Sequence, residues 1–413
     1  VSSFDFKLLA AQWPKTPINV SGSLGTSDQA NLALDEVGSI HTVWRQDGFD
    51  TNSDSGVIYY SRWNGISWTS QGFNISQYNN SGLKGSRDPS VAVGLDRLPQ
   101  IVWSAKNDTG VRQIYFAQFD GTTWKSPTSI LGSDSGVTPS ISVDKTNGFL
   151  YTTWENNGKI YLSEYNKVTW SSPTVVGSGT TPKAKIGTDS IVHIVWKTSS
   201  QSLQYANWRS GKGLSSVENI PMNSLGNDTG SSIDTAIDRF NRLHLVWRND
   251  IYIQYSLRSN VSWSQPEIVN QLPTAFLSAK SGASISVAPT GIVNIAWVST
   301  TKDNKEVIRF RRKLSDGFKQ PFTKILDSTE PVKVNNGTVT ATPTTTAATE
   351  IKRSENIDGY EDIPFSNTAS IAGNPLILAD YKGNIHVIWS NKGANGSDAD
   401  LLHSIKGNVE VIK

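Results

Sequence analysis

An acidic stretch near the N-terminus carries the strongest chemical signal in this sequence. Asp50, Asn52 and Asp54 alternate with other residues, Asp47 precedes them and Gly56 follows. Carboxylate and amide oxygens spaced in this way along a turn can converge on one hard cation, and Ca²⁺ binds about six to eight such oxygens. The pattern predicts a calcium site at Asp47, Asp50, Asn52 and Asp54. A solvated loop that uses Asp and Asn as turn formers is the alternative.

A second set of polar residues comes directly after a recurring tryptophan. Arg45 and Arg248 hold this place in two copies, and either could bind a carboxylate or sulfate through two parallel hydrogen bonds. Glu155, in a third copy, could accept hydrogen bonds from sugar hydroxyls, although an ion pair between Glu155 and Lys197 is an alternative. The expected ligand-binding residues are Arg45, Asp47, Glu155, Lys197, Arg248 and Asp250.

These residues are positioned by an internal repeat. A short apolar segment ending in tryptophan returns 42 to 59 residues apart, except for a last interval of 92 residues. A fixed period of this length is typical of repeat architectures. The repeated tryptophans are Trp44, Trp103, Trp154, Trp196, Trp247, Trp297 and Trp389.

Each copy contains four segments that alternate apolar and polar residues, joined by turns rich in Asn, Asp and Gly. This is the pattern of four antiparallel strands, and the sequence predicts an all-β, seven-bladed β-propeller formed by residues 1–413 as one domain. Residues 11–20 match the template of the fourth strand, so we expect them to complete the last blade and close the ring. A second set of aromatic residues is expected at the start of the outer strands: Trp13, Trp68, Trp124, Trp170, Trp263 and Phe318.

The repeated aromatic residues are expected to pack one blade against the next, because a stacked core needs a large side chain in every repeat. Four histidines, His41, His193, His244 and His386, stand three residues before a repeated tryptophan. We expect them to form polar contacts between blades, and metal binding by pairs from adjacent blades is the alternative.

The stretch "SRWNGISW", residues 61–68, resembles the repeat of sialidase-type propellers, in which Ser, Asp, Gly and an aromatic residue recur. Ser61, Gly65 and Trp68 match, and Trp63 stands where that repeat has Asp. The chain is also similar to propeller lectins whose blades end in a "W…NG…W" hairpin. The resemblance implies the propeller fold, whereas the arginine triad, the Tyr–Glu pair and the Arg-Ile-Pro signature of sialidases do not map onto this sequence.

Composition excludes several classes of function. The net charge is +2 and 18% of the residues are charged, so no basic field favours nucleic acid. No apolar run is long enough for a membrane span, and the lack of cysteine excludes a disulfide framework. The chain begins with Val1 and its one methionine is Met222, so we expect a processed chain with any signal or anchor segment outside it.

A long insertion, residues 328–373, separates the sixth and seventh repeats. Its Thr-rich part cannot bury a core and is typical of an exposed stretch that could serve as a lid or a docking arm. Glycosylation sequons in expected loops favour a secreted or cell-surface protein. The candidate acceptors are Asn19, Asn74, Asn79, Asn107, Asn227, Asn260, Asn336 and Asn395.

The leading expectation is a non-catalytic binding or adhesion module that recognises a glycan or a surface protein through its long loops and needs no cofactor besides calcium. A glycoside hydrolase of the sialidase-like class is the first alternative, with two of Asp47, Asp88, Glu155 and Asp250 as its catalytic carboxylates. The second alternative is a self-assembling subunit of a surface layer or filament.

Overall fold

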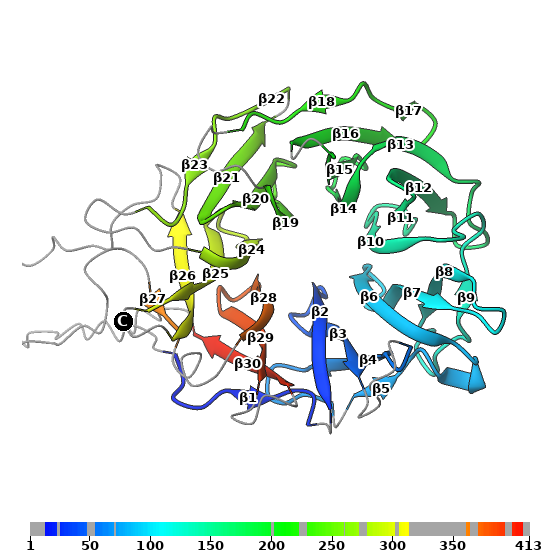
Figure 1. Ribbon diagram of the computed structural model, residues 1–413, viewed down its shortest axis with the longest axis horizontal. Coiled ribbons are helices and arrows are strands. Elements are labelled where there is room, and N and C mark those ends of the chain that lie inside the picture. The colour runs from blue at the N-terminus through cyan, green and yellow to red at the C-terminus, as the bar shows by residue number, and fades with distance from the viewer. Residues whose placement is uncertain are drawn as a thin grey trace, which may run out of the picture.

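The computed structural model is a ring of seven antiparallel β-sheets (Figure 1). This confirms the predicted seven-bladed propeller. No helix in the described part of the chain is long and apolar enough to cross a membrane. The structure describes residues 13–22, 25–47, 54–69, 72–199, 202–222, 229–259, 261–271, 279–301, 305–313, 361–363, 371–392 and 399–407.

Each blade runs outward from a first strand at the centre of the ring to a fourth strand at the rim. The first strands are β2 (Thr26–Leu34), β6 (Lys84–Val93), β10 (Val137–Val143), β14 (Thr180–Ile186), β19 (Thr229–Ile237), β24 (Ala279–Val287) and β28 (Ile371–Ala379). The second strands are β3 (Ile40–Asp47), β7 (Pro99–Lys106), β11 (Leu150–Asn156), β15 (Val192–Lys197), β20 (Leu243–Asn249), β25 (Val293–Thr300) and β29 (Ile385–Lys392).

The outer half of each blade is less regular than the inner half. The third strands are β4 (Val57–Trp63), β8 (Arg112–Gln118), β12 (Lys159–Tyr165), β16 (Leu203–Arg209), β21 (Tyr252–Ser259), β26 (Glu306–Lys313) and β30 (Ala399–Lys406). The fourth strands are β5 (Phe73–Asn74), β9 (Thr128–Ser129), β13 (Thr174–Ser178), β17 (Gly213–Leu214) with β18 (Glu218–Asn219), β22 (Ser262–Trp263) with β23 (Glu267–Ile268), β27 (Glu361–Asp362) and β1 (Ile18–Asn19). One 3₁₀ turn, η1 (Tyr78–Asn80), follows β5.

The N-terminal segment closes the ring, as the sequence predicts. Strand β1 pairs with β30, where Ile18 lies opposite His403, and the Val20 backbone N–H donates to the Leu401 carbonyl oxygen at 2.7 Å. Figure 1 shows β1 in blue beside β30 in red. The last blade therefore takes its fourth strand from the start of the same chain, which removes an exposed sheet edge.

The sixth blade takes its fourth strand from an unexpected place. Strand β27 lies inside the predicted insertion 328–373 and pairs with β26, with the Ile363 N–H donating to the Ile308 carbonyl oxygen at 2.9 Å. Glu361 also accepts a hydrogen bond from Trp13 Nε1 at 3.1 Å. Phe318, expected at this outer strand, lies outside the described residues, as does most of the insertion.

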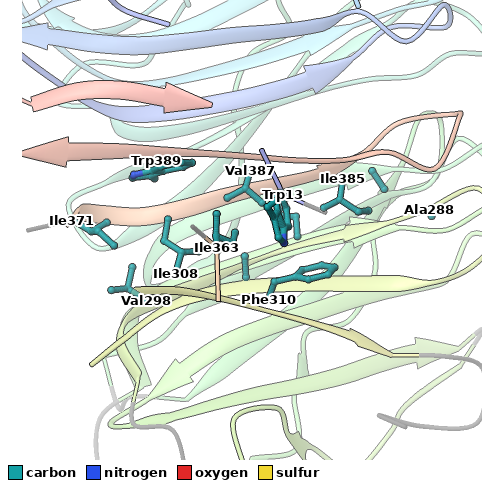
Figure 2. Packing of buried hydrophobic residues seen from close by; sticks show 13 residues of the cluster. Trp13, Ala288, Val298, Ile308, Phe310, Ile363, Ile371, Ile385, Val387 and Trp389 are labelled. Carbon is teal, nitrogen blue, oxygen red and sulfur yellow. The ribbon is translucent and has the colours of Figure 1, made fainter. Parts of the chain in front are cut away.

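The repeated tryptophans pack each blade against the one before it, which confirms the predicted role. All seven are at most 1% exposed. Each lies in a hydrophobic cluster with an aliphatic residue from the end of the preceding fourth strand, as Figure 2 shows for Trp389 and Ile363. The seven aliphatic residues are Val20, Ile75, Ile130, Val176, Ile220, Val269 and Ile363.

Hydrogen bonds also link neighbouring first strands near the centre of the ring. The side chain directly opposite the residue before each repeated tryptophan accepts a backbone N–H from the next blade, as Asn31 does from Val91 at 3.0 Å. Ser90, Ser140, Asp234 and Ser284 do the same in their blades. Lys183 and Leu376 hold this position in the fourth and seventh blades. Neither side chain can accept a hydrogen bond, so this type of link is lacking there.

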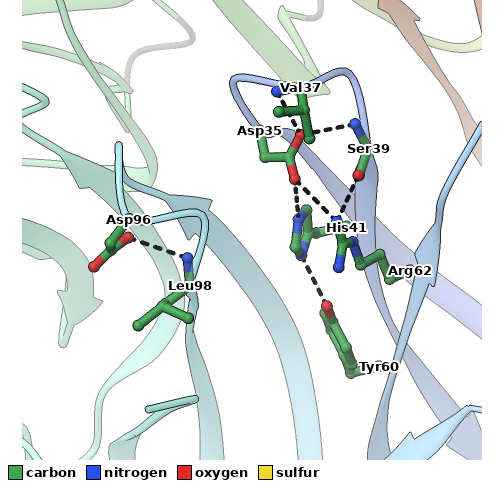
Figure 3. A network of polar contacts seen from close by, with 8 residues as sticks. All are labelled: Asp35, Val37, Ser39, His41, Tyr60, Arg62, Asp96 and Leu98. Atoms are coloured by element: carbon green, nitrogen blue, oxygen red, sulfur yellow. Dashed lines mark hydrogen bonds and ion pairs between the residues drawn. The ribbon is translucent and has the colours of Figure 1, made fainter. Parts of the chain in front are cut away.

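The histidine prediction was wrong in its geometry, because the contacts lie within blades. His41 Nδ1 lies 2.8 Å from the Tyr60 hydroxyl and Nε2 lies 3.4 Å from Asp35 Oδ2, all in the first blade (Figure 3). Asp35 also accepts the backbone N–H groups of Val37 and Ser39, which fixes the turn between β2 and β3. The network Asp238–His244–Tyr255 repeats this arrangement, and Asp380–His386–His403 places a second imidazole where the tyrosine stands.

Candidate functional site at the centre of the loop face

The propeller has two faces of different character. The loops from second to third strands and from fourth to first strands lie on one face, here called the loop face. The tight turns from first to second and from third to fourth strands lie on the other, here called the turn face. Connecting loops tolerate variation and carry binding residues on a rigid scaffold, so the loop face is the natural place for a site.

Every first strand contains a β-bulge toward the loop face. In β2 the register against β3 shifts between Asp28 and Asn31, and Gln29 adopts a left-handed conformation with φ 50°. Asp88, Thr138 and Thr181 hold the corresponding place in the next three blades and have similar positive φ values. A bulge re-aims the side chains beside it, and here it presents polar groups at the centre of the ring.

A cavity of about 320 Å³ lies at this centre. Its walls come from the first strands of the first, fourth, fifth, sixth and seventh blades, and from Trp389 and Ser390 of β29. Polar side chains of both charge signs line it together with apolar ones. The polar lining residues are Asp28, Gln29, Asn31, Lys183, Ser232, Asp234, Ser284, Asn374 and Ser390.

Asp28 is the most distinctive group in this cavity. Its Oδ1 atom is buried and has no hydrogen-bond partner among the described residues. Burial raises the pKa of Asp28, the Arg45 guanidinium 3.7 Å away opposes this, and the Asp88 charge adds to it. An acceptor oxygen left without a donor at the wall of a polar cavity is suited to a ligand that supplies a hydroxyl or N–H group.

The cavity also contains a cationic side. Lys183 replaces a hydrogen-bond acceptor at a position where most blades link to their neighbours, and Lys185 lies two residues further along β14. Burial lowers the pKa of Lys185, with Asp234 opposing the shift and Lys183 adding to it. Asp234 is held by Ser284 Oγ at 2.7 Å and by the Ile285 N–H. The cavity thus offers both a cation and carboxylates to a ligand.

Two further carboxylates extend the acidic side along the loop face. Asp88 lies 3.7 Å from Arg87 Nε, and the Asp88 N–H donates to Gln29 Oε1 at 2.8 Å. Burial raises the pKa of Glu155, hydrogen bonds from the backbone N–H groups of Gly158 and Thr181 lower it, and Asp88 raises it. Asp28, Asp88 and Glu155 therefore form an electrostatically coupled series across three consecutive blades.

The other sequence-predicted ligand residues serve local contacts. Arg45 pairs with Asp47 as well as with Asp28. Arg248 Nε donates to the carbonyl oxygen of Asp250 at 2.5 Å, and its Nη1 donates to that of Lys280 in the sixth blade at 3.0 Å. Lys197 ends β15 and is half-buried. The structure brings Arg45 and Glu155 toward the coupled carboxylates, whereas Arg248 joins two blades.

The candidate calcium loop is only partly described. Asp47 accepts a hydrogen bond from Ser55 Oγ at 2.9 Å, and Asp54 pairs with Lys106 of the next blade at 2.8 Å. The hydrogen bond from Lys106 lowers the pKa of Asp54. Asp50 and Asn52 lie outside the described residues. Among the described residues, no group of three His, Cys, Asp or Glu side chains is arranged to hold a metal ion, so the calcium site stays a prediction.

Four of the eight sequons are described. Asn19 and Asn79 are exposed, and Asn74 and Asn107 are half-exposed. Asn107 accepts the backbone N–H groups of Thr109 and Val111, which holds the β7–β8 turn. Glycosylation stays a prediction. The remaining acceptors, Asn227, Asn260, Asn336 and Asn395, lie outside the described residues.

Sequence reasoning missed Asp28, Lys183 and Asp234. Each lies at or next to a bulge, where strict alternation of inward and outward residues no longer predicts the direction of a side chain. The replacement of small or amide side chains by Lys183 at one repeated position was the available signal. It becomes visible only when the first strands are aligned on their tryptophans.

Comparison with known proteins supports the architecture. No protein-family model matches the chain, and no curated protein matches its sequence. Among solved structures, a protein of unknown function from Dyadobacter fermentans has a TM-score of 0.54 at 9% identity, with 97% of this chain and 100% of that chain covered. A K499G mutant of the NanB sialidase from Streptococcus pneumoniae has a TM-score of 0.50 at 11% identity, with 96% and 70% covered. The Aleuria aurantia lectin, in complex with Fucα1-6GlcNAc, has a TM-score of 0.45 at 10% identity, with 71% and 94% covered.

The chain thus resembles sialidases and propeller lectins, as its repeat indicates. At these identities the likeness to the first two proteins establishes the fold alone. The TM-score of the lectin is too low to bear on the ligand. What the propeller binds has to be argued from its own residues.

Proposed function

We propose that this propeller is a non-catalytic carbohydrate-binding module that acts in secreted form or at the cell surface and holds a glycan at the centre of its loop face. The single observation that carries the proposal is the polar cavity in which Asp28 presents an unpartnered oxygen. Sugars are rich in hydroxyl donors and acceptors, and the cavity provides matching amides, hydroxyls and carboxylates from five blades.

The ligand would enter from the loop face. The acidic loop at Asp47, Asp50, Asn52 and Asp54 belongs to this face, and we propose that Ca²⁺ bound there would order the approach to the cavity. Asp47 and Asp54 are each paired with a cation, Arg45 and Lys106 respectively. A metal at this loop would have to compete with those pairs, so the effect of calcium is best measured with and without added salt.

A glycan array run with calcium and with a chelator tests the proposal. Binding to a defined set of glycans supports the module, and its loss in chelator supports the calcium loop. Binding that is equal in both conditions removes calcium from the proposal and keeps the cavity. No binding in either condition contradicts the proposal.

One observation favours a second candidate, a glycoside hydrolase. The pKa values of Asp28 and Glu155 are both raised, each mainly by burial, and both feel the charge of Asp88. A carboxyl group with a raised pKa beside an ionised one is the arrangement of a general acid with its partner. Release of reducing ends from an array-positive glycan, abolished by Asp88→Asn, would favour this candidate over the binding module.

The assembly hypothesis has less support. It depended on exchange of the N-terminal strand between neighbouring subunits, whereas β1 completes the last blade of its own chain. A surface-layer or filament subunit would need another contact, and the described residues offer no specific evidence for one.

A further inference from the structure

The second blade departs from the polar network that holds the first, fifth and seventh blades. Where the first blade has Asp35, His41 and Tyr60, the second has Gly94, Gln100 and Phe116 at the same register positions. Gly94 provides no carboxylate to meet the side chain on the second strand. The polar end of Gln100 is therefore left without the partners that His41 has.

A cavity of about 420 Å³ lies at this point, on the turn face between the second and third blades. Gln100 lines it, is 7% exposed, and has an Oε1 atom with no hydrogen-bond partner among the described residues. Gln118, opposite Gln100 in the sheet, lies beside it. A buried carbonyl oxygen of this kind is costly to leave unpaired, and a ligand hydroxyl or amide would satisfy it.

The third blade forms the other wall. Tyr165 presents a ring that is itself supported by Phe116 at 5.3 Å and Trp170 at 5.1 Å between centroids. Leu150 and Val143 add apolar surface. A rigid aromatic ring beside amide groups provides both stacking surface and hydrogen bonds for a ring-shaped polar ligand.

The rim carries one uncompensated positive charge. Lys145 pairs with Glu36 of the first blade at 2.6 Å, whereas Lys167 makes no ion pair within the described structure. Lys167 Nζ reaches across the cleft to Gly148, where an added Cβ would lie 3.0 Å from it. Asp96 is engaged by the Leu98 N–H at 3.1 Å, as Figure 3 shows.

We propose that this cleft is a second ligand site, separate from the central cavity, for a polyhydroxylated ligand that carries one oxyanion. Lys167 binds the anionic group, Gln100 accepts a hydrogen bond from a hydroxyl, and Tyr165 supports the ring of the ligand. Carboxylate, sulfate and phosphate share the chemistry that Lys167 recognises. Because the two sites open on opposite faces, one propeller would bind two ligands independently.

Isothermal titration of the full chain with glucose, glucuronate, glucose 6-sulfate and glucose 6-phosphate tests the site and distinguishes the anionic groups. We expect at least one anionic sugar to bind and glucose to bind more weakly. Lys167→Ala should weaken that binding by about tenfold or more, since a charge-assisted hydrogen bond is lost. Lys212→Ala removes an equally exposed lysine from another turn of the same face and should leave the binding unchanged.

Gln100→Leu tests the buried acceptor, with thermal unfolding measured alongside because this position lies in a sheet. If the variant unfolds, Lys167→Ala against Lys212→Ala still decides. Asp28→Asn changes the central cavity alone, so binding that it leaves intact belongs to this cleft. The proposal is overturned if no anionic sugar binds, if Lys167→Ala and Lys212→Ala weaken it equally, or if Asp28→Asn abolishes it.

Discussion

The guanidinium of Arg45 lies 3.7 Å from the carboxylate of Asp28, and the two residues belong to paired strands of the first blade. Arg45 was expected to contact a ligand directly, and the structure shows it beside two carboxylates, Asp28 and Asp47. It therefore acts on the central cavity by setting the charge of Asp28.

Replacing Arg45 by Ala should raise the pKa of Asp28 further, because the guanidinium is the charge that lowers it against the effect of burial. A titration of the side-chain carboxyl signals by NMR measures this. A pKa that stays the same or falls on substitution would contradict the assignment. Lys106→Ala, which removes a cation from Asp54, is the matched control and should leave Asp28 unchanged.

Stability should fall as the pH drops from 6.5 toward 4. Burial lowers the pKa of His41 and His193 from 6.5 to about 4, so in this range the unfolded chain binds protons that the folded chain does not. Their contribution is complete above pH 6.5 and is lost by about pH 4, on the order of 3 kcal/mol for each residue. Asp35, whose pKa is lowered, contributes above its ordinary value of 3.8 and loses this below it, in the same direction.

Urea unfolding at pH 7.5 and at pH 4.5 measures the effect, and unchanged stability between the two would contradict it. His193→Gln places at this position the residue that the second blade uses, Gln100. The variant should show a smaller loss of stability on acidification than the native chain, because one of the protonating groups has been removed.

Ile363→Ala should destabilise the protein as much as Ile75→Ala, by about 2–5 kcal/mol each. Both side chains are at most 1% exposed and lie beneath the tryptophan of the following blade. Val168→Ala, at a turn residue that is 84% exposed, is the control and should change stability by less than about 0.5 kcal/mol. If Ile363→Ala behaves like the control, then 361–363 does not complete the sixth blade.

The repeat made the architecture readable from sequence. Each tryptophan is required by the same packing contact in every blade, so Trp44 and its six counterparts mark the second strands and the hairpin turns follow from them. The fourth strand of the sixth blade could not be predicted. Glu361 and Asp362 lie far along the chain from β26, and a two-residue strand has no periodicity of its own.

The candidate site was harder to predict than the fold. Arg45, Asp88 and Glu155 could be selected from their places in the repeat, whereas Asp28 sits at a bulge that reverses the expected direction of side chains. The histidines were placed in a shared position correctly, but their partners follow from strand register. Tyr60 lies on the third strand of the same blade, where the sequence alone could not show that its hydroxyl reaches His41.

The most direct test of the account is the affinity of Asp28→Asn and Asp108→Asn for a glycan that the array identifies, measured by titration beside the native chain. Asp28 lines the central cavity, whereas Asp108 is an exposed carboxylate on a loop of the same face. The account predicts that Asp28→Asn weakens binding by about tenfold or more while Asp108→Asn leaves it unchanged. Equal affinities for all three proteins would contradict a glycan site in the central cavity.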